Sequence, residues 1–182
     1  MLNFMILKKT TKIFQIEYQL SIPLEDAECY LDLLSQIVGE LNVERGVKYI
    51  NDFAFRSCEQ ITRINLNNEV QLIGNGAFQG CAALNQISLP ESINSIGQMA
   101  FYKCENLTSI ELPESIKSIG VQAFSNSGLK TIQFSSGITS ISKGAFFDCP
   151  SLEEITIPES VKSIGRGAFS RCANLKLSLI HI

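Results

Sequence analysis

The sequence of 182 residues contains no tryptophan and a single histidine, His181. Because nucleophilic triads built on serine or cysteine use a histidine as the base, such a site is hard to assemble from this chain. No two cysteines have the C-x-x-C spacing that zinc sites commonly use. The sequence therefore predicts a protein that is not an enzyme, with no catalytic residues, no metal ligands and no cofactor.

Positive charge and long apolar runs are also scarce. Fifteen Lys and Arg residues stand against 18 Asp and Glu residues, which gives a net charge of −3 and disfavours nucleic acid as a partner. No apolar run reaches the length of a membrane span, so we expect none. The first residues, MLNFMIL, lack the basic start of a signal peptide, so as it stands the sequence favours the cytoplasm, although localisation stays undecided.

What the sequence does contain is a repeat, seen most clearly in residues 96–118. Each unit has an opening Ile, an Ala-Phe pair, usually a Cys, and an apolar-x-x-apolar-x-apolar segment followed by Pro. The opening residues are Ile50, Ile73, Ile96, Ile119, Ile141 and Ile164, separated by 23, 23, 23, 22 and 23 residues. This spacing falls within the range of about 20–29 residues that is typical of leucine-rich repeat solenoids.

Equivalent positions of the units are expected to stack into columns. The cysteine column contains Cys58, Cys81, Cys104, Cys149 and Cys172, with Ser127 in the remaining unit. A free cysteine packs as a small apolar residue, and Ser127 is similar in size but cannot form a disulfide. The column therefore favours buried thiols over the alternatives, which are disulfides between stacked units and metal ligands.

These motifs resemble the leucine-rich repeats of the BspA-like family, also called the Treponema pallidum type, whose unit reads roughly LxxIxIPxxVxxIGxxAFxxC. The resemblance covers residues 46–175. It implies surface proteins of bacteria and protists that take part in adhesion and host binding. On this basis we expect a non-catalytic protein-interaction module. The alternative is a structural spacer, a segment of a longer repeat protein with no ligand of its own.

The expected fold is an α/β right-handed solenoid of about six rungs in residues 46–175, with parallel strands on one face. A strand-helix cap is expected in residues 1–45, because residues 12–22 alternate in polarity and residues 24–38 follow the helical spacing. Residues 176–182 are expected to leave the repeat register, as in a truncated array. An open last rung would then offer an edge for self-association.

Two expectations concern the return side of each rung. Residues 121–126 are expected to form one helical or 3₁₀ turn, with the Ala-Phe pair pointing inward. A glycine follows the opening Ile in four units, which predicts a tight or positive-φ backbone at that position. These glycines are Gly74, Gly97, Gly120 and Gly165.

The outward positions of the predicted strands form the candidate binding face. In the unit around Ile110, for example, Ser109 and Glu111 point outward because side chains alternate along a strand. The face is small, polar and mixed in charge, and its assignment to another protein as partner is an analogy from the fold. It consists of Arg63, Asn65, Gln86, Ser88, Ser109, Glu111, Thr131, Gln133, Glu154 and Thr156.

Overall fold

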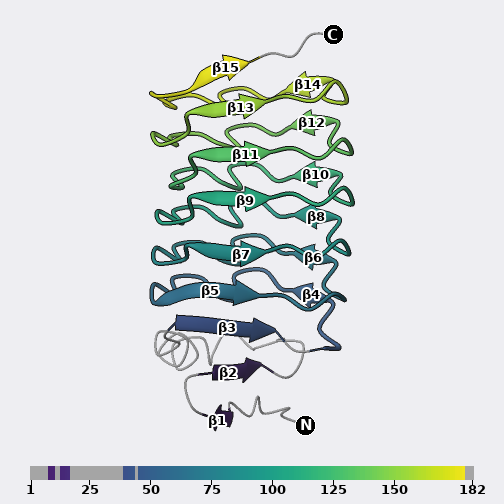
Figure 1. Ribbon diagram of the computed structural model, residues 1–182, viewed down its shortest axis with the longest axis vertical. Helices are drawn as coiled ribbons and strands as arrows, with labels where there is room; N and C mark the ends of the chain where they lie inside the picture. The colour runs from purple at the N-terminus through teal and green to yellow at the C-terminus, as the bar shows by residue number, and fades with distance from the viewer. Residues whose placement is uncertain (1–7, 11–12, 17–38, 44, 179–182) are drawn as a thin grey trace.

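The computed structural model describes residues 8–10, 13–16, 39–43 and 45–178, which form two stacks of strands (Figure 1). After β1 (Lys8–Thr10), the long strands make up the strand face. They are β2 (Ile13–Ile16), β3 (Gly39–Val43), β5 (Ile61–Asn65), β7 (Gln86–Ser88), β9 (Ser109–Glu111), β11 (Thr131–Gln133), β13 (Glu154–Thr156) and β15 (Lys176–Ser178).

Short strands form the second stack, behind the first in Figure 1. They are β4 (Tyr49–Ile50), β6 (Leu72–Ile73), β8 (Ser95–Ile96), β10 (Ser118–Ile119), β12 (Ser140–Ile141) and β14 (Ser163–Ile164). The chain alternates between the two stacks as it advances, so that successive turns wind as a right-handed solenoid. Within each stack, paired neighbours are parallel, except that β1 is antiparallel to β2.

Equivalent residues of consecutive rungs lie opposite each other, as the repeat predicts. Ile64 pairs with Leu41 on one side and with Ile87 on the other, and Ile132 lies between Ile110 and Ile155. These residues point into the space between the two stacks and are buried. One rung cannot cover its own apolar residues, so the continuous core exists only because the rungs stack.

A column of phenylalanine rings fills the centre of the core. The rings of Phe101 and Phe124 are stacked with their centroids 5.3 Å apart, and the other neighbouring pairs lie at 5.5 Å. The middle rings are completely buried, whereas Phe169 in the last rung is only partly buried. The column runs through Phe55, Phe78, Phe101, Phe124, Phe146 and Phe169.

The segment that carries the Ala-Phe pair is a series of turns and not the expected helical turn. In residues 121–126, the N–H of Ser125 bonds to the carbonyl of Gln122 in the same rung. The N–H of Phe124, in contrast, bonds to Ala145 in the next rung. This alternation commits every second amide to the neighbouring rung, which a helix could not do, since a helix pairs its amides within itself.

Two positions in each such turn have left-handed backbone, directly before Ala and two residues after Phe. In one rung they hold Gly76 and Gly80, with φ of 56° and 76°, and in the next rung Met99 and Lys103, with φ of 52° and 59°. The same two positions in the other rungs are occupied by Phe53, Ser57, Gln122, Asn126, Gly144, Asp148, Gly167 and Arg171. The repeat therefore imposes this conformation even on residues with a Cβ atom, at a cost.

We expect Lys103→Gly to raise the free energy of unfolding by about 0.5–1 kcal/mol. Lys103 is exposed and has a left-handed backbone, which is strained for a residue with a Cβ atom. Glycine removes this strain, and we expect that gain to exceed the stability lost because glycine increases the entropy of the unfolded chain. Lys117→Gly is the matched control, because Lys117 is exposed and has no positive φ, so it should lose stability. Urea unfolding of both variants measures the difference, and two losses would contradict the argument.

The predicted glycine column is tight, but its φ angles are not positive. A Cβ atom on Gly97 would lie 2.5 Å from the carbonyl carbon of Gly74, and one on Gly120 would lie 2.4 Å from the amide nitrogen of Gln98. Because these neighbours are backbone atoms of the preceding rung, the glycines allow consecutive rungs to approach. Of the two predicted alternatives the tight backbone is therefore correct and the positive φ is not, since the left-handed glycines of these turns are Gly76, Gly80, Gly144 and Gly167.

At the two ends of the solenoid, the structure differs from the expected boundaries of the cap, the repeats and the tail. Strand β2 continues the strand face by pairing with β3, whereas the predicted helix at residues 24–38 lies outside the described residues. The described residues contain strands and turns and no helix, so they give no support for the α/β class. The expected loss of register is wrong for Lys176–Ser178, because β15 pairs with β13 and places Leu177 opposite Ile155.

Candidate functional site

The strand face presents the predicted outward residues in two columns. One column runs through Arg63, Gln86, Ser109, Thr131 and Glu154, and the other through Asn65, Ser88, Glu111, Gln133 and Thr156. All ten side chains point away from the core, and all except the half-buried Asn65 are exposed. The structure therefore brings every residue of the candidate binding face onto one surface.

Polar contacts tie the two columns together near the start of the solenoid. The side-chain amide of Asn65 donates to the carboxylate of Glu40 and, at 2.7 Å, to the side-chain oxygen of Asn42. Opposite charges also occupy opposite positions on neighbouring strands, with Glu40 across from Arg63 and Glu154 across from Lys176. The strand face is thus a polar surface on which Arg63 and Glu154 lie opposite residues of the other charge, whereas Glu111 lies opposite the neutral Gln133.

The cysteine column contains buried thiols that bond to the backbone. The thiol of Cys81 donates to the carbonyl oxygen of Phe55 at 3.1 Å, and that of Cys104 donates to Phe78 at 3.2 Å. Burial raises the pKa of Cys58 to about 12, and it also raises the pKa of the Cys81 and Cys104 thiols. A thiol that resists ionisation is a poor nucleophile and a poor metal ligand, so these residues fill the core.

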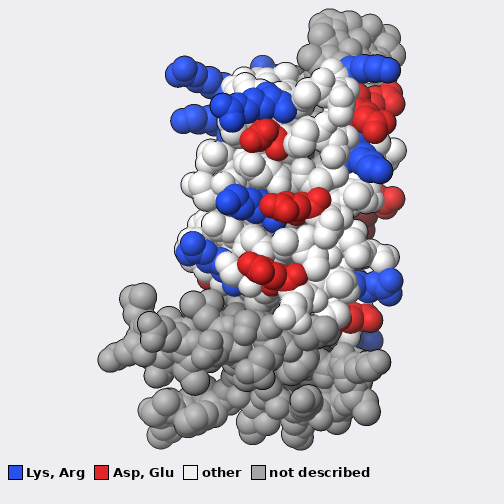
Figure 2. Space-filling model, turned by 90° about the vertical axis from the view of Figure 1, so that its left-hand side faces the viewer, with Lys and Arg blue, Asp and Glu red and all other residues white. Residues whose placement is uncertain are grey.

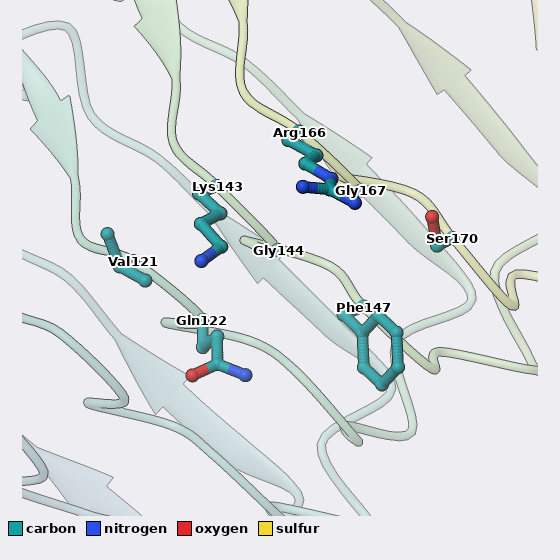
Figure 3. A pocket seen from close by; sticks show the side chains of 8 residues that line it. All are labelled: Val121, Gln122, Lys143, Gly144, Phe147, Arg166, Gly167 and Ser170. Carbon is teal, nitrogen blue, oxygen red and sulfur yellow. The ribbon is translucent and has the colours of Figure 1, made fainter.

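A second surface lies on the turns that lead from each short strand to the next long one, which we call the turn face. It contains a shallow groove of about 390 Å³ between the last two of these turns and the one before them. Figure 3 shows Lys143 and Arg166 on one side of the groove, and Phe147 and Ser170 on the other. The groove is lined by Val121, Gln122, Lys143, Gly144, Phe147, Arg166, Gly167 and Ser170.

The turn face carries aromatic residues beside cations, whereas the ten residues of the candidate binding face include no aromatic residue. The guanidinium of Arg56 lies 5.8 Å from the ring centre of Phe53, and that of Arg171 lies 5.3 Å from the ring centre of Phe147. The side chain of Phe53 is 50% exposed. Aromatic and arginine side chains contribute most to many protein interfaces, so the turn face is a second candidate functional surface.

The architecture described above is that of a known family of repeat proteins. A model of the BspA type leucine rich repeat region matches residues 38–177 in six copies. The chain belongs to this family. The match begins close to β3, which agrees with the pairing of Leu41 and Ile64 and puts the start of the BspA-type repeats before the expected residue 46.

Solved structures share the fold of these BspA-type repeats. The leucine rich repeat protein of T. pallidum superposes with a TM-score of 0.60 at 29% identity, over 75% of this chain and 78% of that chain. A leucine-rich repeat protein from Bacteroides ovatus gives 0.64 at 22% identity, over 98% of this chain and 51% of that one. The pneumococcal vaccine antigen PcpA gives 0.63 at 20% identity, over 94% and 46%.

The chain thus spans about half the length of the last two proteins. A comparison with curated proteins finds no match. In the part of the BspA-type chain that the structure describes, no group of three His, Cys, Asp or Glu side chains could hold a metal ion. Likewise, no helix among the described residues is long and apolar enough to cross a membrane.

Sequence reasoning missed the groove because its residues fall on positions that vary between BspA-type repeats. The position two residues after the opening Ile is a column of its own, and only the last two members are basic. The sequence does contain a signal for the groove, because the residues of this column change from acidic and amide side chains in the first units to cations in the last two. The column consists of Asp52, Asn75, Gln98, Val121, Lys143 and Arg166.

Proposed function

We propose that this chain is a non-catalytic protein-interaction module of a surface or adhesion protein and that it binds its partner through the strand face. The observation that carries the proposal is the regular surface of exposed polar side chains on stacked, mutually paired strands. Rigid elements hold side chains more accurately than loops do, which suits recognition of another protein. Membership of the BspA-type family supports the interaction role, and the surface and adhesion role is an inference from that family.

The described residues provide few groups that are suited to catalysis. The Cys58 thiol is buried and its pKa is raised, and the carboxylates of the candidate binding face, Glu111 and Glu154, are exposed. A catalytic site needs a pocket in which reactive groups converge and water is restricted. The interaction module is therefore the function that the geometry supports best.

The test is a triple variant, Arg63→Ala, Gln86→Ala and Glu111→Ala, in an adhesion assay. Beads coated with the purified chain are counted on cultured epithelial monolayers. We expect at least about a tenfold loss of bound beads with a melting temperature within about 2 °C of the parent, because exposed substitutions change stability little. A second triple variant, Lys117→Ala, Thr139→Ala and Lys162→Ala, changes exposed residues outside the strand face and should keep binding.

The alternative function, a structural spacer with no ligand of its own, predicts a different result. A spacer would show the same bead count for the parent, both triple variants and uncoated beads. Loss of binding in both variants would indicate a non-specific charge effect and would contradict recognition by the strand face. Selective loss in the first variant supports the proposal.

A further inference from the structure

The groove on the turn face exists because two side chains are missing from a column that is elsewhere filled. Gly144 and Gly167 occupy the left-handed position before Ala, where two earlier rungs carry Met99 and Gln122. In the earlier rung that also has a glycine, the Phe53 ring covers it, since a Cβ on Gly76 would lie 2.5 Å from that ring. The two glycines of the groove are covered less tightly, since a Cβ on Gly144 would lie 3.2 Å from the Gln122 side chain and one on Gly167 would lie 3.3 Å from the Ser170 hydroxyl.

The cations beside the groove differ from the residues that precede them in the same column. At the N-terminal end, the carboxylate of Asp52 accepts a hydrogen bond from the backbone N–H of Asn75 at 2.7 Å, and the Asn75 side chain accepts one from Gln98 at 2.8 Å. Lysine and arginine side chains have no acceptor and cannot make this contact. Lys143 and Arg166 are exposed and line the groove instead.

Neither of these two cations has a carboxylate partner among the described residues. The one ion pair found there joins Arg171 to Asp148 at 4.0 Å, so the acidic side chain nearest to Lys143 in sequence is already engaged. Like charges at equivalent positions of adjacent turns repel each other, and an anion between them lowers this repulsion. Lys143 and Arg166 thus place two positive charges one rung apart with no carboxylate paired to either.

We propose that this groove binds an acidic segment of a partner protein. A carboxylate of the segment lies between the ammonium of Lys143 and the guanidinium of Arg166, where charge-assisted hydrogen bonds are strong. A neighbouring apolar side chain of the segment packs against Phe147, over Gly144 and Gly167. Figure 3 shows the arrangement that this requires, with both cations on one side and the Phe147 ring on the other.

The charge pattern of the turn face favours a short acidic segment over a polyanion such as DNA or a sulfated glycan. A polyanion needs cations along its whole length. Figure 2 shows acidic and basic side chains interleaved on the side of the molecule that is at the left in Figure 1, with basic side chains projecting near its C-terminal end. Because Glu59, Glu105 and Asp148 interrupt the positive charge, only a ligand of local charge fits.

This site is separate from the strand face, so the two proposals can fail independently. The probe is the blocked pentapeptide GDLEG, titrated into the isotope-labelled chain at low salt and followed by amide chemical shifts. We expect the amides of Gly144 and Gly167 to shift and those of Ser88 and Thr131 on the strand face to stay. The neutral peptide GNLQG should bind at least about tenfold more weakly, because it lacks the charges.

Matched variants separate the groove from general electrostatics. K143Q/R166Q should weaken GDLEG binding at least about tenfold, whereas K117Q/K162Q removes the same charge from exposed lysines elsewhere and should bind as the parent does. Gly167→Gln keeps both cations but fills the groove, and it should also weaken binding. Its fold is checked by its melting temperature, since Gln122 already occupies the equivalent left-handed position.

Several results would overturn the proposal. These are an equal loss in the two charge variants, equal binding of GDLEG and GNLQG, or no shift of the Gly144 and Gly167 amides at millimolar peptide. Shifts caused by a heparin octasaccharide at concentrations where GDLEG causes none would also overturn it, in favour of a polyanion site. None of these outcomes affects the adhesion assay on the strand face.

Discussion

Replacing Phe101 with alanine is expected to lower the free energy of unfolding by about 3–5 kcal/mol. The Phe101 ring is completely buried and is stacked between Phe78 and Phe124, at centroid distances of 5.5 and 5.3 Å. Removing it takes away contacts with both neighbouring rungs and leaves a cavity in the middle of the column. Because a solenoid is stabilised by nearest-neighbour interfaces, the two halves also lose their coupling.

Phe169→Ala is the control for this prediction. Phe169 lies in the last complete turn, is partly buried and stacks on Phe146 alone among the described rings. We expect a loss of about 1–2 kcal/mol there, because the ring of Phe169 buries less apolar surface in the folded chain than the ring of Phe101 does. Urea unfolding followed by circular dichroism measures both values, because the chain has no tryptophan for fluorescence. Equal losses at the two positions would show that the column does not transmit stability along the solenoid.

Gly120→Ala is expected to cost about 3 kcal/mol, although only one methyl group is added. That methyl would lie 2.4 Å from both the amide nitrogen of Gln98 and the carbonyl carbon of Gly97. The rungs cannot move apart easily at this point, because the N–H of Gly120 donates to the carbonyl of Ile96 at 2.8 Å. The added methyl therefore strains backbone on both sides.

Gly144→Ala is the control for Gly120→Ala. It tests whether the loss of stability at Gly120 comes from the contact between rungs or from the loss of glycine's conformational freedom. Gly144 has a φ of 60°, and its added methyl would lie 3.2 Å from the flexible side chain of Gln122. Because the repeat places Met99 and Gln122 at equivalent positions with similar φ, we expect a loss of only about 1 kcal/mol. Thermal and urea unfolding give the free energy of unfolding of the two variants, and a larger loss for Gly144→Ala than for Gly120→Ala would contradict this account.

The repeat spacing was enough to predict the rungs, their parallel stacking and the inward columns. The opening Ile and the Ala-Phe pair recur at nearly constant steps, so stacking in line buries the copies that have a rung on both sides and leaves Ile164 near the end exposed. The ten residues of the candidate binding face follow from the same register, because side chains alternate along a strand. Their role in binding stays a prediction.

The turn conformation could not be predicted in the same way. Residues 121–126 have the length of a helical turn, and periodicity cannot distinguish amides that bond within a rung from those that bond to the next. The tail was misjudged for a related reason. A single residue is missing between Leu175 and Leu177 relative to the preceding unit, and β-pairing of Lys176 with Glu154 restores the register after that deletion.

The amino-acid sequence by itself determined the repeat, the family and the identity of the core, because these depend only on which residue types recur and at what spacing. Tertiary structure alone decided where rungs touch. The closeness of Gly120 to Gln98 and the groove lined by Gly144 and Gly167 arise from residues on different rungs. Such contacts depend on the exact path of the backbone between columns, and for that reason the groove beside Lys143 and Arg166 became visible only in three dimensions.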